Sequence, residues 1–190
     1  MIHGAMGSGL LFSTFRDWLV ERGTPEEWIH APDFPWTSCM DDFAQAVGRE
    51  AERLRGRTGR DKVVLVCHSL GCGAVLSYVN LHGGAAHVSH VVTLGGDNYG
   101  AYPRLWGLVS CATRDMTPFN SEYVQRMFRE GETRPGVRYC AIQAGMDWVL
   151  PSRTTALKGA KTVEIPWAGH IDIIHREQTF RAVLRECLAG

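Results

Sequence analysis

The segment from Val63 to Val79 constrains the fold of this chain more than any other. Five consecutive apolar residues, Val63–Cys67, run into a short turn around Ser69, and an apolar stretch with helical spacing follows. A strand that is apolar on both faces is typical of the interior of a parallel sheet. Only small residues fit two positions before and after Ser69 in so tight a turn, and Cys67 and Gly71 stand there. The pattern predicts a buried parallel strand that leads directly into a helix.

Ser69 itself has two interpretations. A sharp strand-to-helix turn forces its central residue into strained backbone angles and lifts the side chain above the sheet, as in the Gly-x-Ser-x-Gly turns that present nucleophilic serines. Here Cys67 replaces the first glycine of that pattern. The other interpretation is a serine that caps the following helix, because serine is a favoured N-cap residue. Residues elsewhere in the chain are needed to distinguish a nucleophile from a helix cap.

Strand and helix patterns alternate along the chain. After a strand stub at residues 1–4, strands are predicted at 28–31, 63–67, 88–94, 137–143 and 162–165, and helices at 10–22, 41–55, 74–79, 122–129 and 179–188. This alternation predicts βαβ units, in which a compact, mainly parallel sheet carries helices on both faces. We expect one α/β domain over residues 1–190, with residues 97–128 as a loop or cap-like excursion over the ligand site.

Composition narrows the function classes. A chain of 190 residues with 45% hydrophobic content suits a single domain with a sizeable core. Its 20 basic and 20 acidic residues cancel, so no basic surface for nucleic acid is expected. Mean hydropathy is −0.13, and no apolar run approaches the roughly 18 residues of a membrane span. We expect a monomer with no integral membrane segment.

The N-terminal residues contain no signal peptide. The compartment therefore stays open: the protein is secreted if an upstream signal was removed, and cytoplasmic otherwise.

The cysteines and histidines do not form a recognisable metal motif. Six cysteines are scattered without Cys-x-x-Cys spacing, and His82, His87 and His90 are joined by no nearby cysteine or carboxylate. We expect no metal. Cys67 and Cys72 are predicted to be buried thiols. Cys111 and Cys140 are a candidate disulfide pair, which the sequence alone does not decide.

Polar residues with catalytic chemistry follow several predicted strands. In a parallel α/β sheet, ligands bind beyond the carboxyl ends of the strands. Ser69 follows the strand at 63–67, Asp147 follows the strand at 137–143, and His170 follows the last strand. In a Ser-His-Asp arrangement, His170 would take the hydroxyl proton and return it to the leaving group, while Asp147 would fix the imidazole tautomer. The sequence predicts that these three side chains form a catalytic triad.

Such chemistry also needs two donors for the oxyanion. The amide of Leu70 is one candidate, and the amide of Ala5, in the turn after the first stub, is the other. Met6, Trp148 and Ile171 flank the predicted site and are either core residues or walls for an acyl chain.

Alternatives remain for the acid and the base. Asp147 could be a turn or capping residue, and Asp172 and Asp97 are its rivals. His175 and His68 compete with His170. We expect His68, which immediately precedes Ser69, to point away from the site.

Together these segments resemble the small α/β-hydrolase lipases of the minimal bacterial type, lipase class 2, similar to Bacillus lipase A. The matching segments are His3-Gly4-Ala5, Cys67–Gly71, Val91–Gly96, Asp147 and Gly169-His170-Ile171. The resemblance implies an α/β-hydrolase fold with about six strands, and neither metal nor cofactor. It also implies that Ser69 is the nucleophile, Asp147 the acid and His170 the base, with an oxyanion hole from the Ala5 and Leu70 amides.

The function expected on these grounds is a serine carboxylic-ester hydrolase, either an esterase or a lipase. It would act through an acyl-enzyme on short to medium acyl esters, taken from a small molecule or a lipid. Two alternatives stay open. One is a thioesterase or acyltransferase that uses the same triad. The other is a hydrolase-fold binding protein that has lost turnover.

Overall fold

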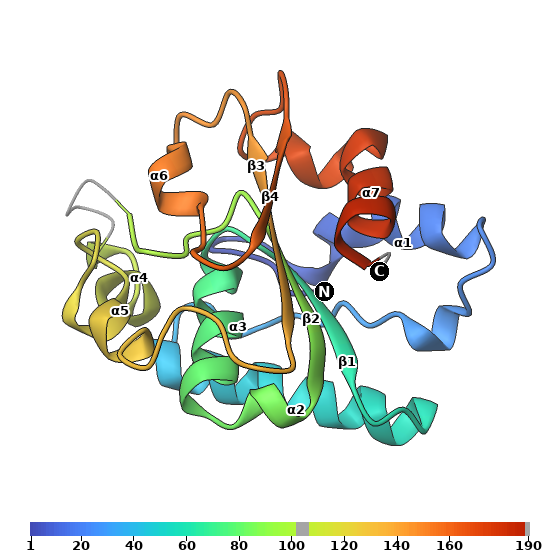
Figure 1. The fold of residues 1–190 in the computed structure, drawn as a ribbon, viewed down its shortest axis with the longest axis horizontal. Helices are drawn as coiled ribbons and strands as arrows, with labels where there is room; N and C mark the ends of the chain where they lie inside the picture. Colours follow the sequence, from blue (N-terminus) through green and yellow to red (C-terminus); the bar gives the residue numbers. More distant parts are fainter. Residues whose placement is uncertain (102–106, 189–190) are drawn as a thin grey trace.

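A four-stranded parallel sheet forms the centre of the molecule. A computed structural model describes residues 1–101 and 107–188. The strands lie in the order β1-β2-β3-β4 (Figure 1). They are β1 (Val63–His68), β2 (Val88–Leu94), β3 (Arg138–Ala144) and β4 (Lys161–Ile165). All three pairs are parallel, and each strand begins and ends within one residue of the range predicted from its apolar pattern.

Two further strands of the expected sheet are not formed in the described residues. At the free edge of β1, Ile2 makes a single parallel bridge with Cys67. The strand predicted at 28–31 is wrong: Glu26–Trp28 is a 3₁₀ turn, and Ile29 is extended. Extended backbone becomes a strand only where a neighbouring ladder satisfies its N–H and C=O groups. The described sheet therefore has four strands, where about six were expected.

Seven α-helices are described along with the sheet. They are α1 (Ser13–Val20), α2 (Met40–Thr58), α3 (Leu70–Leu81), α4 (Cys111–Asp115), α5 (Glu122–Met127), α6 (Ser152–Thr155) and α7 (Glu177–Ala182). Beyond α7 the chain continues as a π-helical turn, Val183–Leu188, so the predicted closing helix is two segments.

The helices cover both faces of the sheet and create two cores (Figure 1). On one face, Phe15 of α1 stacks on Phe180 of α7 with ring centroids 4.5 Å apart, and Val66 of β1 joins the same cluster. On the other face, α2 and α3 cover Leu65 and Cys67. Successive residues of β1 therefore face opposite layers, as the pleat of a strand requires.

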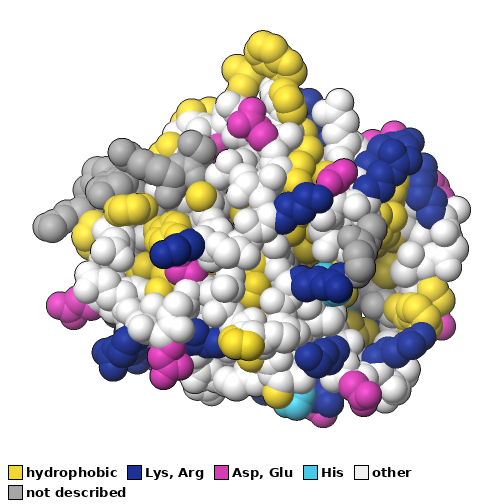
Figure 2. Space-filling model, viewed as in Figure 1, with side chains coloured by type: hydrophobic (Ala, Val, Ile, Leu, Met, Phe, Trp, Pro, Cys, Tyr) yellow, Lys and Arg dark blue, Asp and Glu magenta, His cyan; other side chains and the backbone are white. Residues whose placement is uncertain are grey.

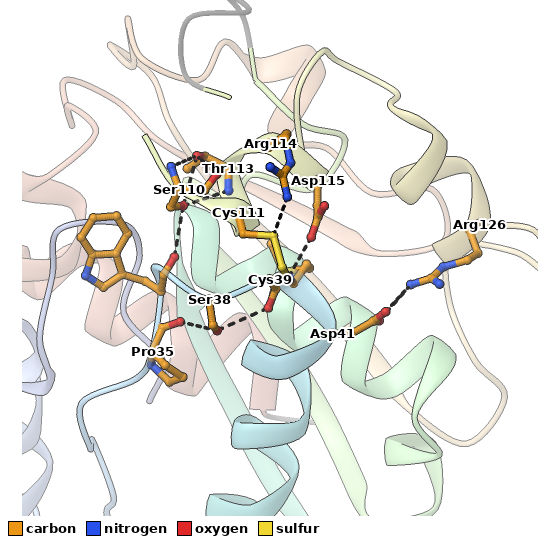
Figure 3. The surroundings of a disulfide bond; sticks show 12 residues. Pro35, Ser38, Cys39, Asp41, Ser110, Cys111, Thr113, Arg114, Asp115 and Arg126 are labelled. Carbon is orange, nitrogen blue, oxygen red and sulfur yellow. Dashed lines mark hydrogen bonds and ion pairs between the residues drawn. A yellow bond between two sulfur atoms is a disulfide. The ribbon is translucent and has the colours of Figure 1, made fainter. Parts of the chain in front are cut away.

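Residues 97–128 contain α4 and α5, which pack beside α2 and α3 (Figure 1); residues 102–106 lie outside the described part of the chain. A disulfide between Cys39 and Cys111 ties α4 to the start of α2 (Figure 3). The Asp115 carboxylate accepts the Met40 N–H at 2.9 Å and so satisfies one of the free amides at that helix end. Together these contacts hold the described part of the excursion against α2.

The candidate disulfide between Cys111 and Cys140, which the sequence left undecided, is not formed. Cys111 pairs with Cys39, and Cys140 pairs with Cys187. Cys140 lies in the core under α7, whereas the neighbours of Cys111 in α4 belong to the core under α2 and α3. The sheet therefore separates the two cysteines. Cys67 and Cys72 are free and buried, as predicted.

Within the described ranges, no helix is both long enough and apolar enough to cross a bilayer.

Candidate active site

Ser69 occupies the sharp turn between β1 and α3. Its backbone has φ 53° and ψ −130°, a region that residues with a side chain rarely adopt. Two glycines allow neighbouring segments to approach it. A Cβ on Gly71 would lie 2.4 Å from the His3 carbonyl oxygen, and a Cβ on Gly4 would lie 2.7 Å from the Ser69 Cβ. The turn thus needs glycine at both places, and it leaves Ser69 partly exposed.

Ser69, His170 and Asp147 form one hydrogen-bonded chain. Ser69 Oγ lies 3.0 Å from His170 Nε2, and His170 Nδ1 lies 2.8 Å from Asp147 Oδ2. Because a carboxylate only accepts, Nδ1 carries the imidazole proton and Nε2 is free to accept the serine proton. The second Asp147 oxygen accepts the amides of Val149 and Leu150 at 2.9 and 2.8 Å. The structure therefore brings the three residues singled out in the sequence into the order that proton transfer from serine requires.

The two residues predicted to supply oxyanion donors also lie beside Ser69. Leu70 is the first residue of α3, and amides of a first helical turn have no partner within the helix. Ala5 belongs to the turn that the Gly7 N–H closes onto the Gly4 carbonyl at 3.3 Å. The approach of Gly4 to the Ser69 side chain places this turn at the nucleophile.

His3, for which no role was predicted, anchors that turn. Its Nδ1 lies 2.9 Å from the Gly4 carbonyl oxygen, and its Nε2 accepts the Phe34 N–H at 2.8 Å. Both ring nitrogens are thus used by the neutral imidazole, and burial lowers the pKa of His3. The sequence shows an N-terminal His-Gly pair. It does not show that His3 bonds to Phe34, because the two residues lie 31 positions apart.

The rival acids lie in other surroundings. Asp172 accepts the Gly169 N–H and pairs with Arg176. Asp97 is 5% exposed, and its own N–H donates to the Ser69 carbonyl oxygen at 3.0 Å. Burial raises the pKa of Asp97 to about 7. Neither carboxylate forms a described hydrogen bond to the His170 ring.

His68 does not point away from the site, and that prediction is wrong. Its Nε2 lies 2.8 Å from the main-chain oxygen of His170, and the two imidazole rings are 4.9 Å apart. The alternation of side chains along the predicted strand could have indicated this orientation. His68 and Val66 share a face of β1, and that face meets the layer containing the residues after β4. The rival His175 is exposed.

Apolar side chains are exposed around these loops. Met6, Trp148 and Ile171 are 76%, 88% and 55% exposed, so the alternative that they are core residues is wrong. Trp167 and Met146, for which no role was predicted from the sequence, are 75% and 56% exposed. Hydrophobic side chains gather at the end of the molecule toward which β3 and β4 run (Figures 1 and 2).

One described cluster has the composition of a metal site. The sulfurs of Cys39 and Cys111 and a carboxylate oxygen of Asp115 lie within 4.8 Å of one another. The sulfurs are joined in the disulfide and offer no thiolate, which is the form that binds a metal. Of the histidines considered earlier, His82 lies 3.0 Å from Asp41, and His90 Nδ1 lies 3.1 Å from the Ser89 hydroxyl.

No known family model matches this sequence. Solved structures are nevertheless similar to it. A mature lipase of Bacillus licheniformis matches with a TM-score of 0.73 and 17% identity, over 96% of this chain and 88% of that one. A bromoperoxidase of Bacillus anthracis matches with a TM-score of 0.72 and 17% identity, over 100% and 90%. A monoacylglycerol lipase of Paleococcus ferrophilus matches with a TM-score of 0.70 and 16% identity, over 97% and 91%.

The chain has an α/β-hydrolase fold. In an α/β-hydrolase fold the strand-to-helix turn presents the nucleophile, and the acid and the histidine follow later strands. Ser69, Asp147 and His170 stand at those places in this chain. Similarity at these identities identifies the fold.

Proposed function

We propose that this protein is a serine carboxylic-ester hydrolase that works through an acyl-enzyme. The observation that carries the proposal is the hydrogen-bonded chain from Ser69 Oγ through His170 to Asp147, with its 3.0 and 2.8 Å contacts. A serine hydroxyl is a poor nucleophile unless an adjacent base removes its proton. The buried carboxyl of Asp147 gives that base a fixed orientation.

The reaction would proceed in two halves. Ser69 Oγ attacks the ester carbonyl carbon while its proton moves to His170 Nε2, and the amides of Leu70 and Ala5 stabilise the oxyanion. The carbon–oxygen bond to the alcohol then breaks, and His170 returns the proton to the departing alkoxide. In the second half, water gives a proton to His170 and attacks the acyl-enzyme. The acid leaves, and Ser69 regains its proton.

The substrate would be a short to medium acyl ester from a small molecule or a lipid. The exposed side chains of Met6, Trp148 and Ile171 offer apolar contact for an acyl chain beside a partly exposed nucleophile. Two of the similar structures are named lipases, which supports ester substrates. Each step uses only protein groups and water, so the proposal includes neither metal nor cofactor. The active form is proposed to be a monomer.

Hydrolysis of p-nitrophenyl esters of increasing acyl length tests the proposal, with Ser69→Ala as the control. We expect turnover that the substitution abolishes and an optimum at short to medium chains. A fluorophosphonate probe should label the wild-type protein at Ser69. Folded protein that neither hydrolyses any ester nor labels at Ser69 would overturn the proposal. Added alcohols separate hydrolysis from acyl transfer, because a transferase would give the alcohol ester as its main product.

A further inference from the structure

His68 lies directly behind the base of the proposed triad. It is the last residue of β1 and is 2% exposed. Its main-chain N–H donates to the Ile2 carbonyl oxygen at 2.9 Å, which fixes the backbone at the edge of the sheet. Its Nε2 lies 2.8 Å from the His170 carbonyl oxygen, and the ring centroids of the two histidines are 4.9 Å apart.

The partner of Nε2 determines the tautomer of His68. A carbonyl oxygen only accepts, so Nε2 must carry the proton and donate it to His170. The other nitrogen, Nδ1, is buried and has no hydrogen-bond partner in the described part of the chain. A second proton on that nitrogen would be buried without an acceptor. Burial accordingly lowers the pKa of His68 to about 4, an effect to which the neighbouring His170 adds, so the ring is neutral at ordinary pH.

The anchored carbonyl belongs to the loop after β4, in which the Ala168 carbonyl oxygen also accepts the Met146 N–H at 2.9 Å. Outside the sheet, the Gly169 N–H donates to Asp172, and Arg176 donates to the Trp167 carbonyl oxygen. These bonds hold Trp167 and Gly169 from the solvent side. The bond from His68 holds His170 itself from the sheet side, where Ser69 directly follows the end of β1.

We propose that His68 is a positioning residue, whose Nε2–H fixes the main chain of His170 so that the His170 ring meets Ser69 Oγ. One strand would then set both ends of the Ser69–His170 contact, because Ser69 directly follows His68. The bond to Asp147 orients the His170 ring about its own axis, but it leaves the position of the His170 main chain to other contacts. An error of about 1 Å in such a position can reduce turnover about a hundredfold.

The inference rests on the proposed role of His170 as the base. Its test uses two amide side chains that differ in reach. In glutamine the amide nitrogen is as many bonds from Cβ as Nε2 is in histidine, so His68→Gln retains a donor at the His170 carbonyl. In asparagine the amide nitrogen corresponds to Nδ1, so His68→Asn buries a similar polar group that cannot reach it.

We expect His68→Asn to lower kcat for a p-nitrophenyl ester about ten- to a hundredfold with KM within about twofold of wild type, and His68→Gln to stay within about threefold in both. A role limited to stability would change the amount of folded enzyme and not separate the two variants. Equal kcat for His68→Asn and wild type would overturn the inference. Equal losses in both folded variants would also overturn it, because they would assign the effect to ring packing.

A measurement on the wild-type protein covers the case in which a variant does not fold. Nitrogen-15 NMR of labelled histidine should show His68 with a proton on Nε2, a bare Nδ1 and no titration between pH 5 and 8. A proton on Nδ1, or titration within that range, would overturn the inference whatever the activity. Failure of wild-type turnover together with unlabelled Ser69 would instead overturn the proposed function.

Discussion

The carboxyl groups near Ser69 differ in what surrounds them, and the difference favours Asp147 as the acid of the proposed triad. Asp147 receives two backbone amides on one oxygen and the His170 ring on the other. Asp172 pairs with Arg176 at the surface, and Asp97 is buried with one oxygen unpaired in the described part of the chain. Residue type and position along the chain left three candidates for the acid. Their hydrogen-bond partners distinguish them, because only Asp147 forms a described hydrogen bond to the His170 ring.

Replacing Asp147 with asparagine should lower kcat by orders of magnitude and leave folding intact. An amide can still accept the Val149 and Leu150 N–H groups. Its NH₂ group, however, would face His170 Nδ1 and favour the imidazole tautomer with the proton on Nε2, which cannot accept from Ser69. Steady-state kinetics with a p-nitrophenyl ester check this. Asp172→Asn is the control and should change kcat by less than about threefold, since the amide retains the Gly169 contact. The reverse order of effects would assign the acid to Asp172.

Replacing Asp97 with asparagine should stabilise the protein at high pH. The folded-state pKa of Asp97 is about 7, above the ordinary value of 3.8, so folding favours the protonated carboxyl. Stability linked to this group is therefore lost as pH rises from about 4 to about 7, by up to about 4 kcal/mol. Asparagine stays neutral and avoids this loss.

Urea unfolding at pH 5 and pH 8 measures the effect of Asp97→Asn. The gain in unfolding free energy should be larger at pH 8 than at pH 5. Asp17→Asn, at an exposed carboxylate, is the matched control and should show no such difference. A gain for Asp97→Asn that is the same at both pH values would contradict an elevated pKa at this position.

The short helix α4 is held in place by contacts that are distant in sequence. It has five residues, too few for a stable helix alone, and the disulfide from Cys111 to Cys39 closes a separation of 72 residues. The double variant Cys39→Ser/Cys111→Ser should lose about 2–4 kcal/mol of unfolding free energy, because its unfolded chain is less restricted.

Denaturant titration without reductant measures this loss. In reductant the wild-type protein also lacks the Cys39–Cys111 bond, so the two proteins should then unfold at nearly the same urea concentration. A difference of the same size with and without reductant would show that the serine substitutions themselves, and not the lost crosslink, destabilise the protein.

The strands were predictable because their signal is local. The segment Val88–Leu94 has apolar residues at Val88, Val91, Val92 and Leu94, ends at a glycine pair and forms a strand over the predicted range. The positions of Ser69, Asp147 and His170 after their strands followed from the same pattern. The segment at 28–31 has a similar local pattern but no neighbouring ladder, and local sequence does not report whether a ladder is present.

The remaining errors have a common cause in three-dimensional pairing. Cys111 was a candidate partner for Cys140, but the pleat of β3 turns Cys140 toward Cys187 on the opposite face of the sheet from α4. The orientation of His68 was misjudged as well, although alternation along β1 places it with Val66. In both cases the partner of a side chain depends on two things: the face of the strand on which it lies, and the helix or loop that covers that face. Spacing along the chain predicts the face but does not show which helix or loop covers it.

At the scale of the whole molecule, several exposed apolar side chains lie in the loops that follow β3 and β4 and in the turn beside Ser69. Trp167 and Met6 there are exposed although their φ angles are 61° and 58°, values that glycine or asparagine would adopt with less strain. Trp148, the most exposed of the group, lies next to Asp147. Tryptophan is suited to a lipid–water boundary because its ring is apolar and its N–H is polar.

Trp148→Gln should therefore reduce hydrolysis of an emulsified ester more than hydrolysis of the same ester in solution. Its effect on unfolding free energy should stay within about 0.5 kcal/mol, as for most exposed sites. The measurement is the ratio of activity on the emulsified ester to activity on the dissolved ester, for the variant and for wild type. Trp28→Gln is the matched control, because Trp28 is also exposed but lies under Arg60, just beyond the end of α2. Equal ratios in the two variants would contradict a contribution of Trp148 to binding at the lipid surface.

The Cys140–Cys187 bond also determines how the molecule would bear mechanical load. It joins the interior strand β3 to the last described turn, and the 47-residue separation between them includes β4, α7 and His170. Tension applied at the C-terminal end would pass through the sulfur bridge into the middle of the sheet. The bridged segment would carry no force, so the base of the proposed triad lies on a part of the chain that pulling does not stretch.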